Sequence, residues 1–204
     1  MGNPYHKIML LDMHIHTRFS PCSIIRVRQL VTVIRQKGLD GVCITDHDTT
    51  ASLSVLRHAS EFSGFCVIVG MEYTTNKGDF LVFGPVENIP SGMEAEGLFD
   101  WAKREGAVTI AAHPFRRTRP ADSDILGRAE IVELLNGRNR SSENELCRKW
   151  VQEQGEGIKT TGGSDAHTLD EVGKVVTVFK KNIYDMDDLI EALHNNDCSP
   201  RQRP

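Results

Sequence analysis

The stretch that decides the fold is Leu10-Leu11-Asp12-Met13-His14-Ile15-His16, an apolar run that ends in a His-x-His pair. In an extended strand, side chains two residues apart point to the same face. Asp12, His14 and His16 would therefore form one polar row on an otherwise apolar strand. Burying a row of imidazoles is costly unless a bound cation compensates for the lost solvation, and imidazole nitrogen is a common metal ligand. The pattern favours a metal-binding strand over two hydrogen-bonded core histidines, provided that further ligands occur elsewhere in the chain.

The composition is typical of a soluble globular protein and excludes several other classes. The chain has 204 residues, of which 39% are hydrophobic and 25% charged, so it can bury one substantial core but is short for two domains. The net charge of −4 argues against a global basic field that would attract nucleic acid. The sequence lacks an apolar run of the roughly 18 residues needed to cross a membrane. Its five cysteines contain no CxxC pair, so we expect a cytoplasmic protein with no membrane partner.

Strand and helix patterns alternate along the whole chain. We expect strands at 8–16, 41–45, 65–74, 79–83, 107–112, 129–135, 158–162 and 174–179, and helices at 24–37, 50–62, 93–105, 142–154 and 184–195. Such alternation implies parallel strands with right-handed crossovers, in an open sheet or a barrel. We expect a single domain over residues 1–198 and a frayed tail over 199–204, which holds two prolines and two arginines.

Residues of the types that bind metals recur where the predicted strands end. They are His14, His16, Asp46, His47, Glu72, His113, Asp165 and His167. The carboxyl ends of strands form the functional face of barrels and open α/β sheets, so we expect these side chains to converge. They exceed the needs of one ion, which implies two or three divalent ions, and the nitrogen and oxygen donors suit Zn, Mn or Fe better than Ca or Mg. Clustered ions activate water and neutralise the charge of a phosphate under attack.

These motifs, taken as an ordered set, resemble those of the PHP family (polymerase and histidinol phosphatase). The resemblance extends from about residue 11 to residue 167. It rests on His-x-His at 14–16, Thr-Asp-His-Asp-Thr-Thr at 45–50, Gly-Met-Glu at 70–72, Ala-His-Pro-Phe-Arg at 112–116 and Gly-Gly-Ser-Asp-Ala-His at 162–167.

The resemblance implies an α/β fold, a distorted (β/α)7 TIM-like barrel with a trinuclear metal centre at the carboxyl ends of the strands. By the family pattern the ligands fall into three sets: His14, His16, Glu72 and Asp165 for one metal, Glu72 as a bridge with His113 for the second, and His47 with His167 for the third. The implied protein is a small, stand-alone, metal-dependent phosphoesterase. In it a metal-bridging hydroxide attacks a phosphomonoester, either a small phosphorylated metabolite or a nucleotide.

Two departures from the family pattern leave ligands open. Many relatives carry Asp or His six residues after the His-x-His pair, as a further ligand to the third metal, whereas this chain has Cys22. A thiolate could bind that metal, or Cys22 could be a bystander. Some relatives place a further His between the positions of His113 and Asp165, which this chain lacks, so the second site could be loose or completed by water. Asp79 remains a candidate for an additional carboxylate ligand.

Three more residues have candidate roles beside the ligands. Asp12 and Asp46 could accept hydrogen bonds from imidazole N–H groups and fix the ring tautomers. Asp46 could instead relay a proton to the leaving group, which would make it catalytic. Arg116 follows His113 closely, and a guanidinium binds phosphate through two parallel hydrogen bonds, so we expect Arg116 to hold the substrate phosphate.

The leading hypothesis is therefore a phosphoesterase that acts on a small phosphorylated substrate. On this hypothesis nucleic acid could bind only as a substrate that is processed at one end. The interval 73–112 is too short for the capping insertion of some nucleotide-cleaving relatives, so we expect an open mouth. Two alternatives stay open. Amidohydrolase chemistry also uses His-x-His and a late Asp, although Asp46-His47 and His167 argue against it. A nucleic-acid-binding or partner module with a vestigial site is the other alternative, opposed by the near-complete ligand set.

Overall fold

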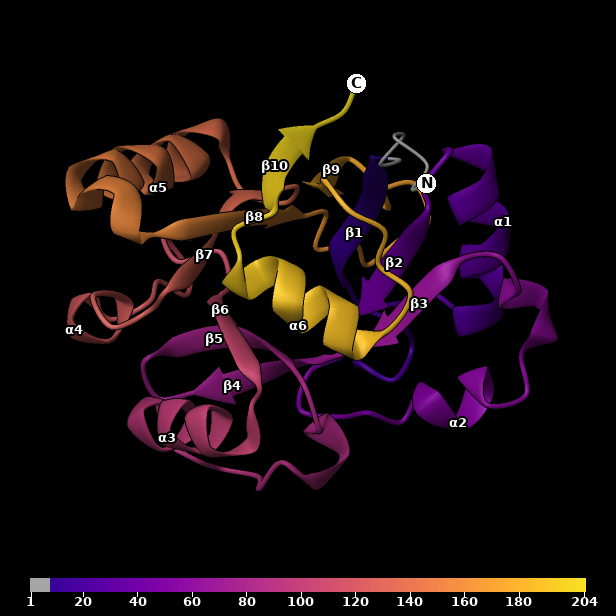
Figure 1. Ribbon diagram of the computed structural model, residues 1–204, viewed down its shortest axis with the longest axis horizontal. Helices are drawn as coiled ribbons and strands as arrows, with labels where there is room; N and C mark the ends of the chain where they lie inside the picture. The colour runs from indigo at the N-terminus through magenta and orange to yellow at the C-terminus, as the bar shows by residue number, and fades with distance from the viewer. Residues whose placement is uncertain (1–7) are drawn as a thin grey trace, which may run out of the picture.

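Two five-stranded sheets form the framework of the protein (Figure 1). The computed structural model describes residues 8–204. In spatial order, the first sheet consists of β10 (Cys198–Gln202), β9 (Val175–Phe179), β1 (Met9–Ile15), β2 (Gly41–Ile44) and β3 (Cys66–Val69). The second consists of β4 (Met71–Thr75), β5 (Gly78–Phe83), β6 (Val108–Ala111), β7 (Ile131–Asn136) and β8 (Lys159–Gly163). The α-helices of the described chain are α1 (Leu30–Gln36), α2 (Leu53–Leu56), α3 (Ala95–Glu105), α4 (Ser123–Leu126), α5 (Ser141–Gln154) and α6 (Met186–His194). The predicted α/β class is confirmed.

The strand directions are mixed rather than uniformly parallel. In the first sheet β1, β2 and β3 are parallel, whereas β9 and β10 run antiparallel to their neighbours. In the second sheet β6, β7 and β8 are parallel, whereas β5 runs antiparallel to both of its neighbours, β4 and β6. A tight turn joins Thr75 to Gly78, and two strands joined in this way can only pair antiparallel.

The predicted (β/α)7 barrel is corrected to two sheets without continuous closure. Within residues 8–204, the sheets are joined by two isolated parallel bridges, His47 with Glu72 and Ile15 with Ala166. The predicted strand at 65–74 is in fact β3 and β4, which Gly70 separates and which belong to different sheets. A Cβ at Gly70 would lie 2.6 Å from the carbonyl oxygen of Val82, so this close passage between the sheets requires glycine.

The predicted frayed tail at 199–204 is also wrong. Cys198–Gln202 form β10, which pairs with β9 along its whole length. Arg203 extends the attachment, because its backbone N–H donates to the carbonyl oxygen of Lys174 at 2.8 Å and its Nη2 to that of Lys37 at 2.7 Å. The prolines and arginines that indicated fraying are compatible with this strand because β10 lies at the edge of the sheet.

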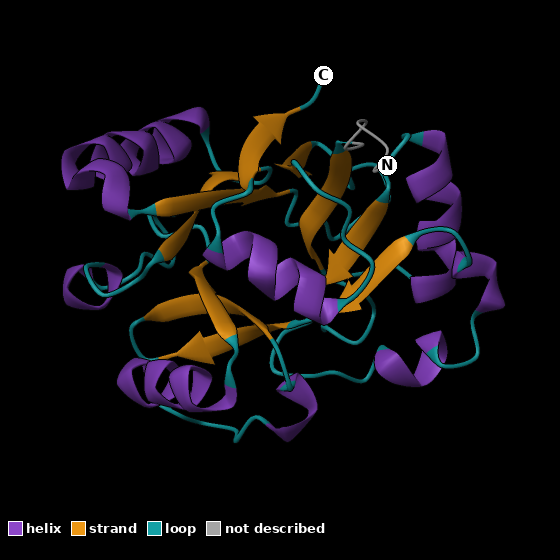
Figure 2. Ribbon diagram, viewed as in Figure 1, coloured by secondary structure: helices purple, strands orange, loops and turns teal. Residues whose placement is uncertain are grey.

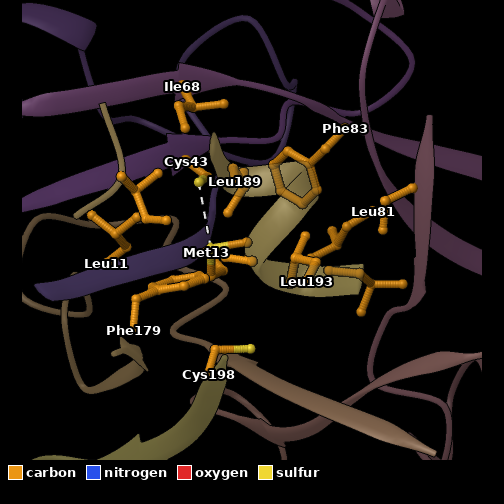
Figure 3. Close-up of a cluster of buried hydrophobic side chains, with 14 of the residues drawn as sticks. Leu11, Met13, Cys43, Ile68, Leu81, Phe83, Phe179, Leu189, Leu193 and Cys198 are labelled. Atoms are coloured by element: carbon orange, nitrogen blue, oxygen red, sulfur yellow. Dashed lines mark hydrogen bonds between the residues drawn. The ribbon is translucent and has the colours of Figure 1, made fainter. Parts of the chain in front are cut away.

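An apolar core fills the space between the two sheets, and α6 covers one end of it. Figure 3 shows Leu189 and Leu193 of α6 among side chains from both sheets, and Met13 and Cys43 meet there with their sulfur atoms 3.5 Å apart. Burying each large side chain of this kind contributes about 1.5–3 kcal/mol. Ile183, just before α6, donates its N–H to the sulfur of Met9 at the start of β1. The helix therefore covers the amino-terminal ends of the parallel strands and does not cover their carboxyl ends.

The other helices lie around the outside of the sheets (Figure 2). Leu98 and Trp101 of α3 pack against the second sheet, and Leu30 and Ile34 of α1 pack against the first. The predicted helix at 50–62 is reduced to α2 and a 3-10 turn at Ser60–Phe62, and α4 was not predicted. Among residues 8–204, none of the helices combines the length and the apolar character that crossing a bilayer requires.

The close pairing of β2 and β3 generates a stability prediction. A Cβ at Gly41 would lie 1.9 Å from the carbonyl oxygen of Cys66 on the paired strand. We expect Gly41→Ala to force the strands apart and to lower the free energy of unfolding by about 1–3 kcal/mol, the usual cost of overpacking. Urea unfolding followed by circular dichroism would measure the change.

Gly157→Ala is the matched control, because a Cβ at Gly157 would meet no atom within 4 Å. An equal loss of stability in both variants would contradict the steric explanation.

Candidate metal centre

The strands bring the predicted ligands together at the end of the core opposite α6. His14 lies on β1 and Glu72 on β4, and the others follow strands: His16 after β1, His47 after β2, His113 after β6, and Asp165 and His167 after β8. The backbone φ is 31° at His113 and 54° at Asp165. Residues other than glycine rarely adopt this left-handed region, and such strain is characteristic of functional sites.

The ligand atoms form three groups, in each of which all atoms lie within 4.8 Å of one another. The first group is His14, His16 and Asp165; the second is His14, Glu72 and His113; the third is His16, Cys22, His47 and His167. Because His14 and His16 each belong to two groups, the three groups interlock. An arrangement of this kind can hold several cations a few ångströms apart.

Two buried imidazoles meet at the centre of the site. The Nε2 atoms of His14 and His16 lie 3.0 Å apart, and both rings are fully buried. On the other side of each ring, His14 Nδ1 lies 3.0 Å from Oε1 of Glu133, and His16 Nδ1 lies 3.2 Å from Oγ of Ser20. With both Nδ1 atoms donating, the two Nε2 lone pairs face each other. This contact requires a shared cation, either a proton or a metal ion.

Glu72 is placed between the first and second groups. Its Oε2 lies 3.2 Å from His14 Nε2 and 2.9 Å from His16 Nε2, and its Oε1 lies 2.8 Å from His113 Nε2. Asp165 Oδ1 approaches the same pair, at 3.4 Å from His16 Nε2. The carboxylate of Glu72 therefore faces both groups with different oxygens, which is the geometry that a bridging ligand needs.

The pKa values reflect an excess of negative charge. Burial disfavours a charged His14, but the neighbouring carboxylates, with Glu133 foremost, raise the pKa of this ring well above its ordinary value. Burial would likewise raise the pKa of Glu72, but the charge of His14 and the hydrogen bond from His113 hold it well below its usual range. The pKa of Asp165 is also lowered against burial, chiefly by His14. The carboxylates thus stay ionised and attract cations.

Two imidazoles of the third group, His47 and His167, have lowered pKa values, whereas hydrogen bonds to Asp165 and Glu72 raise the pKa of His16 against the effect of burial. Burial lowers the pKa of His47, and burial together with the charge of His16 lowers that of His167 to about 4. His167 Nδ1 donates to the carbonyl oxygen of Asp165 at 2.8 Å, which leaves its Nε2 lone pair available. The neutral ring with one nitrogen held by a backbone carbonyl is the form in which histidine binds metals.

The opening of the site lies at the third group. The ligands of the first two groups are buried, whereas Cys22 is exposed and the His47 side chain is 32% exposed. Solvent or a ligand would therefore reach the centre from this side.

Arg116 extends over the edge of the site and is held by three polar side chains. Its Nη2 donates to Oδ2 of Asp165 at 2.6 Å and to Oδ1 of Asn136 at 2.8 Å, and its Nε donates to Oδ1 of Asn139 at 3.0 Å. The side chain is 22% exposed. The guanidinium expected to bind phosphate therefore lies against a predicted metal ligand and is partly open to solvent.

Glu133 is a site residue that the sequence analysis did not identify. It is buried in β7, and its Oε1 accepts the hydrogen bond from His14. Its Oε2 accepts from the backbone N–H of His113 at 2.9 Å and from Nδ2 of Asn136 at 2.9 Å. Glu133 thus orients residues of both buried groups. The available signal was that Glu133 stands within the apolar run 131–135 of the predicted strand, whereas the other acidic residue of that strand, Glu130, stands near its start.

Asp12 binds backbone amides rather than an imidazole, which corrects the predicted contact. Its Oδ1 accepts from the N–H of Ser164 at 2.9 Å, and its Oδ2 from that of Gly173 at 2.7 Å. Burial raises the pKa of its carboxyl group to about 6 despite these hydrogen bonds. Asp12 therefore fixes the segment after β8 that carries Asp165 and His167.

Asp46 reaches His16 only through Ser20, so its predicted direct contact with a ring is also wrong. Its Oδ1 accepts from the N–H of Thr17 and from Oγ of Ser20, both at 2.7 Å, and its Oδ2 accepts from Oγ1 of Thr17 at 2.6 Å. Ser20 in turn accepts the N–H of His47 at 2.9 Å. Asp46 thereby holds the loop after β1. Its role in proton transfer stays a prediction.

The sequence left open whether Cys22 and Asp79 are metal ligands, and their positions in the structure differ. Cys22 belongs to the third group. Asp79 is buried and forms an ion pair with Arg119, and it joins none of the three groups. Its Oδ1 has no hydrogen-bond partner among the described residues. The second group therefore consists of three candidate ligands among the described residues.

Comparison with protein families and curated sequences gives three matches. The model of a family described as PHP-associated matches residues 141–198. An uncharacterized protein of Methanocaldococcus jannaschii is 30% identical over 192 residues, which cover 89% of this chain and 75% of the relative. A second uncharacterized protein of that organism is 29% identical over 159 residues, covering 71% of this chain and 93% of the relative.

Three solved structures share the fold. PsfC from Pseudomonas syringae has a TM-score of 0.76 at 19% identity, with 96% of this chain and 92% of that chain covered. A Bifidobacterium adolescentis protein, provisionally assigned as a metal-dependent phosphoesterase, has a TM-score of 0.67 at 20% identity, with 90% and 95% covered. Endonuclease Q in complex with a 27-mer duplex bearing an abasic lesion has a TM-score of 0.73 at 17% identity, with 93% and 57% covered.

The lowered pKa of His167 generates a prediction for the chelator-treated protein. We expect this ring to titrate at about 4 rather than at 6.5. The unfolded chain protonates this ring near pH 6.5 and the folded chain only near pH 4. The neutral ring of His167 therefore contributes fully to the free energy of unfolding above pH 6.5, and this contribution is lost as the pH falls toward 4. Histidine NMR titration and urea unfolding at a series of pH values would measure both effects.

His167→Gln should remove the corresponding resonance and flatten the pH dependence of unfolding in this window. Titration of the wild-type ring near 6.5 would contradict the assignment.

Proposed function

Since the chain belongs to the PHP (polymerase and histidinol phosphatase) family, we propose that it is a metal-dependent hydrolase and, specifically, a phosphoesterase acting on a small phosphomonoester. The observation that carries the proposal is that three interlocking ligand groups meet and that the partly exposed guanidinium of Arg116 binds Asp165 of the first group. The provisional assignment of the Bifidobacterium protein supports the same activity.

The residues present fit a cluster of divalent ions. The facing nitrogens of His14 and His16 need a shared cation, and the surrounding carboxylates stay ionised. The holders would be His14, His16 and Asp165 for one ion, His14, Glu72 and His113 for another, and His16, His47 and His167 for the third. When bound, such ions supply hydroxide from water at neutral pH and offset the charge of phosphate. Their nitrogen and oxygen donors are those of Zn, Mn or Fe sites.

The chain's own residues orient the ligands before any substrate enters. Glu133 holds the Nδ1–H of His14, and Ser20, itself held by Asp46, accepts that of His16. Both rings therefore present Nε2 to the same point. Fixed tautomers and fixed ring directions reduce the reorganisation that metal binding and catalysis would otherwise require.

Arg116 is placed to bind the phosphate oxygens. Its Nη2 now donates to Asp165, while Asn136 and Asn139 fix the plane of the guanidinium. Once a cation shares the charge of Asp165, the same N–H groups can donate to phosphate, which a guanidinium binds in bidentate fashion. The partial exposure of the Arg116 side chain suits a substrate that enters from solvent.

The surroundings of the opening favour a small substrate or an exposed phosphate end. The chain between Glu72 and His113 forms the hairpin of β4 and β5, α3 and β6, and α3 packs on the outer face of the second sheet. This part of the chain is therefore used for the framework rather than for a cap over the site. We expect a preference for accessible terminal phosphates, with nucleic acid accepted only at an end.

Removal of the bridging carboxylate tests the metal-dependent activity. We expect Glu72→Gln to lose at least one metal equivalent and to lower kcat/KM for phosphomonoesters at least about 100-fold. Loss of a residue that only supports a ligand typically costs about 10- to 100-fold, and loss of a ligand itself should cost more. Elemental analysis and a panel of phosphomonoesters, phosphodiesters, lactones and cyclic amides would measure this. Glu130→Gln, at a 75% exposed side chain, is the matched control.

Faster turnover of a lactone or cyclic amide than of any phosphate would favour amidohydrolase chemistry instead. Wild-type protein that binds no metal and turns over nothing would contradict the proposed function.

Removal of the guanidinium tests the binding of phosphate. We expect Arg116→Gln to raise KM for a phosphomonoester about 10- to 100-fold, which corresponds to the loss of roughly 1.5–3 kcal/mol from charged hydrogen bonds. Arg117→Gln is the matched control, because that residue binds Glu143 through its backbone N–H. Metal content should be the same in both variants. Equal KM values in the two variants would exclude Arg116 from phosphate binding.

A further inference from the structure

We propose that Cys22 binds metal as a thiolate and that the third ligand group is a zinc-type site, distinct in metal preference from the two buried groups. The thiol and one ring nitrogen from each of His16, His47 and His167 lie within 4.8 Å of one another. The inference rests on the metal centre of the proposed function, but it does not depend on phosphate hydrolysis.

The rings of His47 and His167 both lie against the ring of His16. The ring centroids of His16 and His47 lie 4.4 Å apart, and those of His16 and His167 lie 4.5 Å apart. The ring of His16 is fully buried, and its Nδ1 is used by Ser20, so its Nε2 is the nitrogen that faces the groups. The third group therefore consists of imidazoles that converge on one point, with Cys22 beside them.

The loop after β1 holds Cys22 in this position. Ser23 Oγ donates to the carbonyl oxygen of His16 at 2.7 Å and lies 3.2 Å from that of His167. Ser20, on the other side, contacts His16 Nδ1 and the backbone N–H of His47. The residues that flank Cys22 are thus bonded to all three histidines of the group. Because the backbone on both sides of Cys22 is held in this way and the thiol already lies beside the three rings, the chain needs little rearrangement to bind a metal here.

Cys22 differs from the other cysteines in its surroundings. Four thiols belong to apolar clusters and are buried, namely those of Cys43, Cys66, Cys147 and Cys198. Cys22 is exposed and stands among imidazoles. Apolar packing explains the four buried cysteines and does not explain Cys22.

Three imidazoles and one thiolate form the four-coordinate nitrogen and sulfur set that Zn²⁺ prefers, and thiolate is a poor ligand for Mn²⁺. The first two groups offer imidazole nitrogen and carboxylate oxygen without sulfur. The centre therefore combines one soft site at its opening with two harder sites in its interior, and a mixed set of ions is expected to fill it.

Cobalt reports directly on a thiolate ligand. Chelator-treated, reduced full-length protein would be titrated with Co²⁺ and followed by absorption spectroscopy without substrate. We expect a near-ultraviolet sulfur-to-cobalt charge-transfer band in the wild type, and its loss in Cys22→Ser with the visible cobalt bands retained. Cys198→Ser is the matched control and should keep the charge-transfer band. Circular dichroism would verify that each variant is folded.

Metal competition tests the preference of the site. We expect Cys22→Ser to weaken binding of the last Zn²⁺ equivalent at least about 10-fold. Cys22→Asp, which supplies oxygen in place of sulfur, should bind Mn²⁺ at this site at Zn²⁺ concentrations at which the wild type does not.

The outcomes separate this inference from the proposed function. Visible cobalt bands without a charge-transfer band in the wild type, or a band that persists in Cys22→Ser, would overturn the thiolate ligand alone. Failure of the wild type to bind any cobalt would overturn the metal centre as well. A protein that shows the band and hydrolyses no phosphate would support the thiolate ligand and contradict only the phosphoesterase activity.

Discussion

The contact between the two buried imidazoles of His14 and His16 is the constraint on which the rest of the site depends. Their Nε2 atoms lie 3.0 Å apart in the protein interior, where two facing lone pairs are strongly unfavourable without a cation. The ionised carboxylates of Glu72 and Asp165 beside them increase the demand for positive charge. An arrangement that is costly for the isolated chain becomes favourable once cations are bound.

Much of the surrounding structure maintains this contact. Glu133 and Ser20 hold the outer nitrogens of the two rings, and Asp46 holds Ser20. A Cβ at Gly163 would lie 2.4 Å from Cβ of His14, so glycine is needed for β8 to approach β1 this closely. That approach brings the segment with Asp165 and His167 over the end of β1. The same polar network therefore sets ring orientation and the position of distant ligands.

The framework divides structural and chemical roles between the two ends of the core. Helix α6 covers the amino-terminal ends of the parallel strands with apolar side chains, and the carboxyl ends carry the polar groups. Two mixed sheets enclose the core between these ends. Among the described residues two isolated bridges join the sheets, and one of them pairs His47 with Glu72. Ligands thus lie at the seam between the sheets, where side chains from both can meet.

The sequence by itself determined the types and order of the candidate ligands and most of the elements that carry them, because these signals are local. The His-x-His pair, the Gly-Met-Glu and the Gly-Gly-Ser-Asp-Ala-His motifs are each read within a few residues. The tertiary structure alone decided which ligands share a group, that Asp79 pairs with Arg119, that Cys22 lies beside His47 and that the tail forms β10. These outcomes depend on contacts between segments far apart in the chain, and local periodicity carries no information about such pairings.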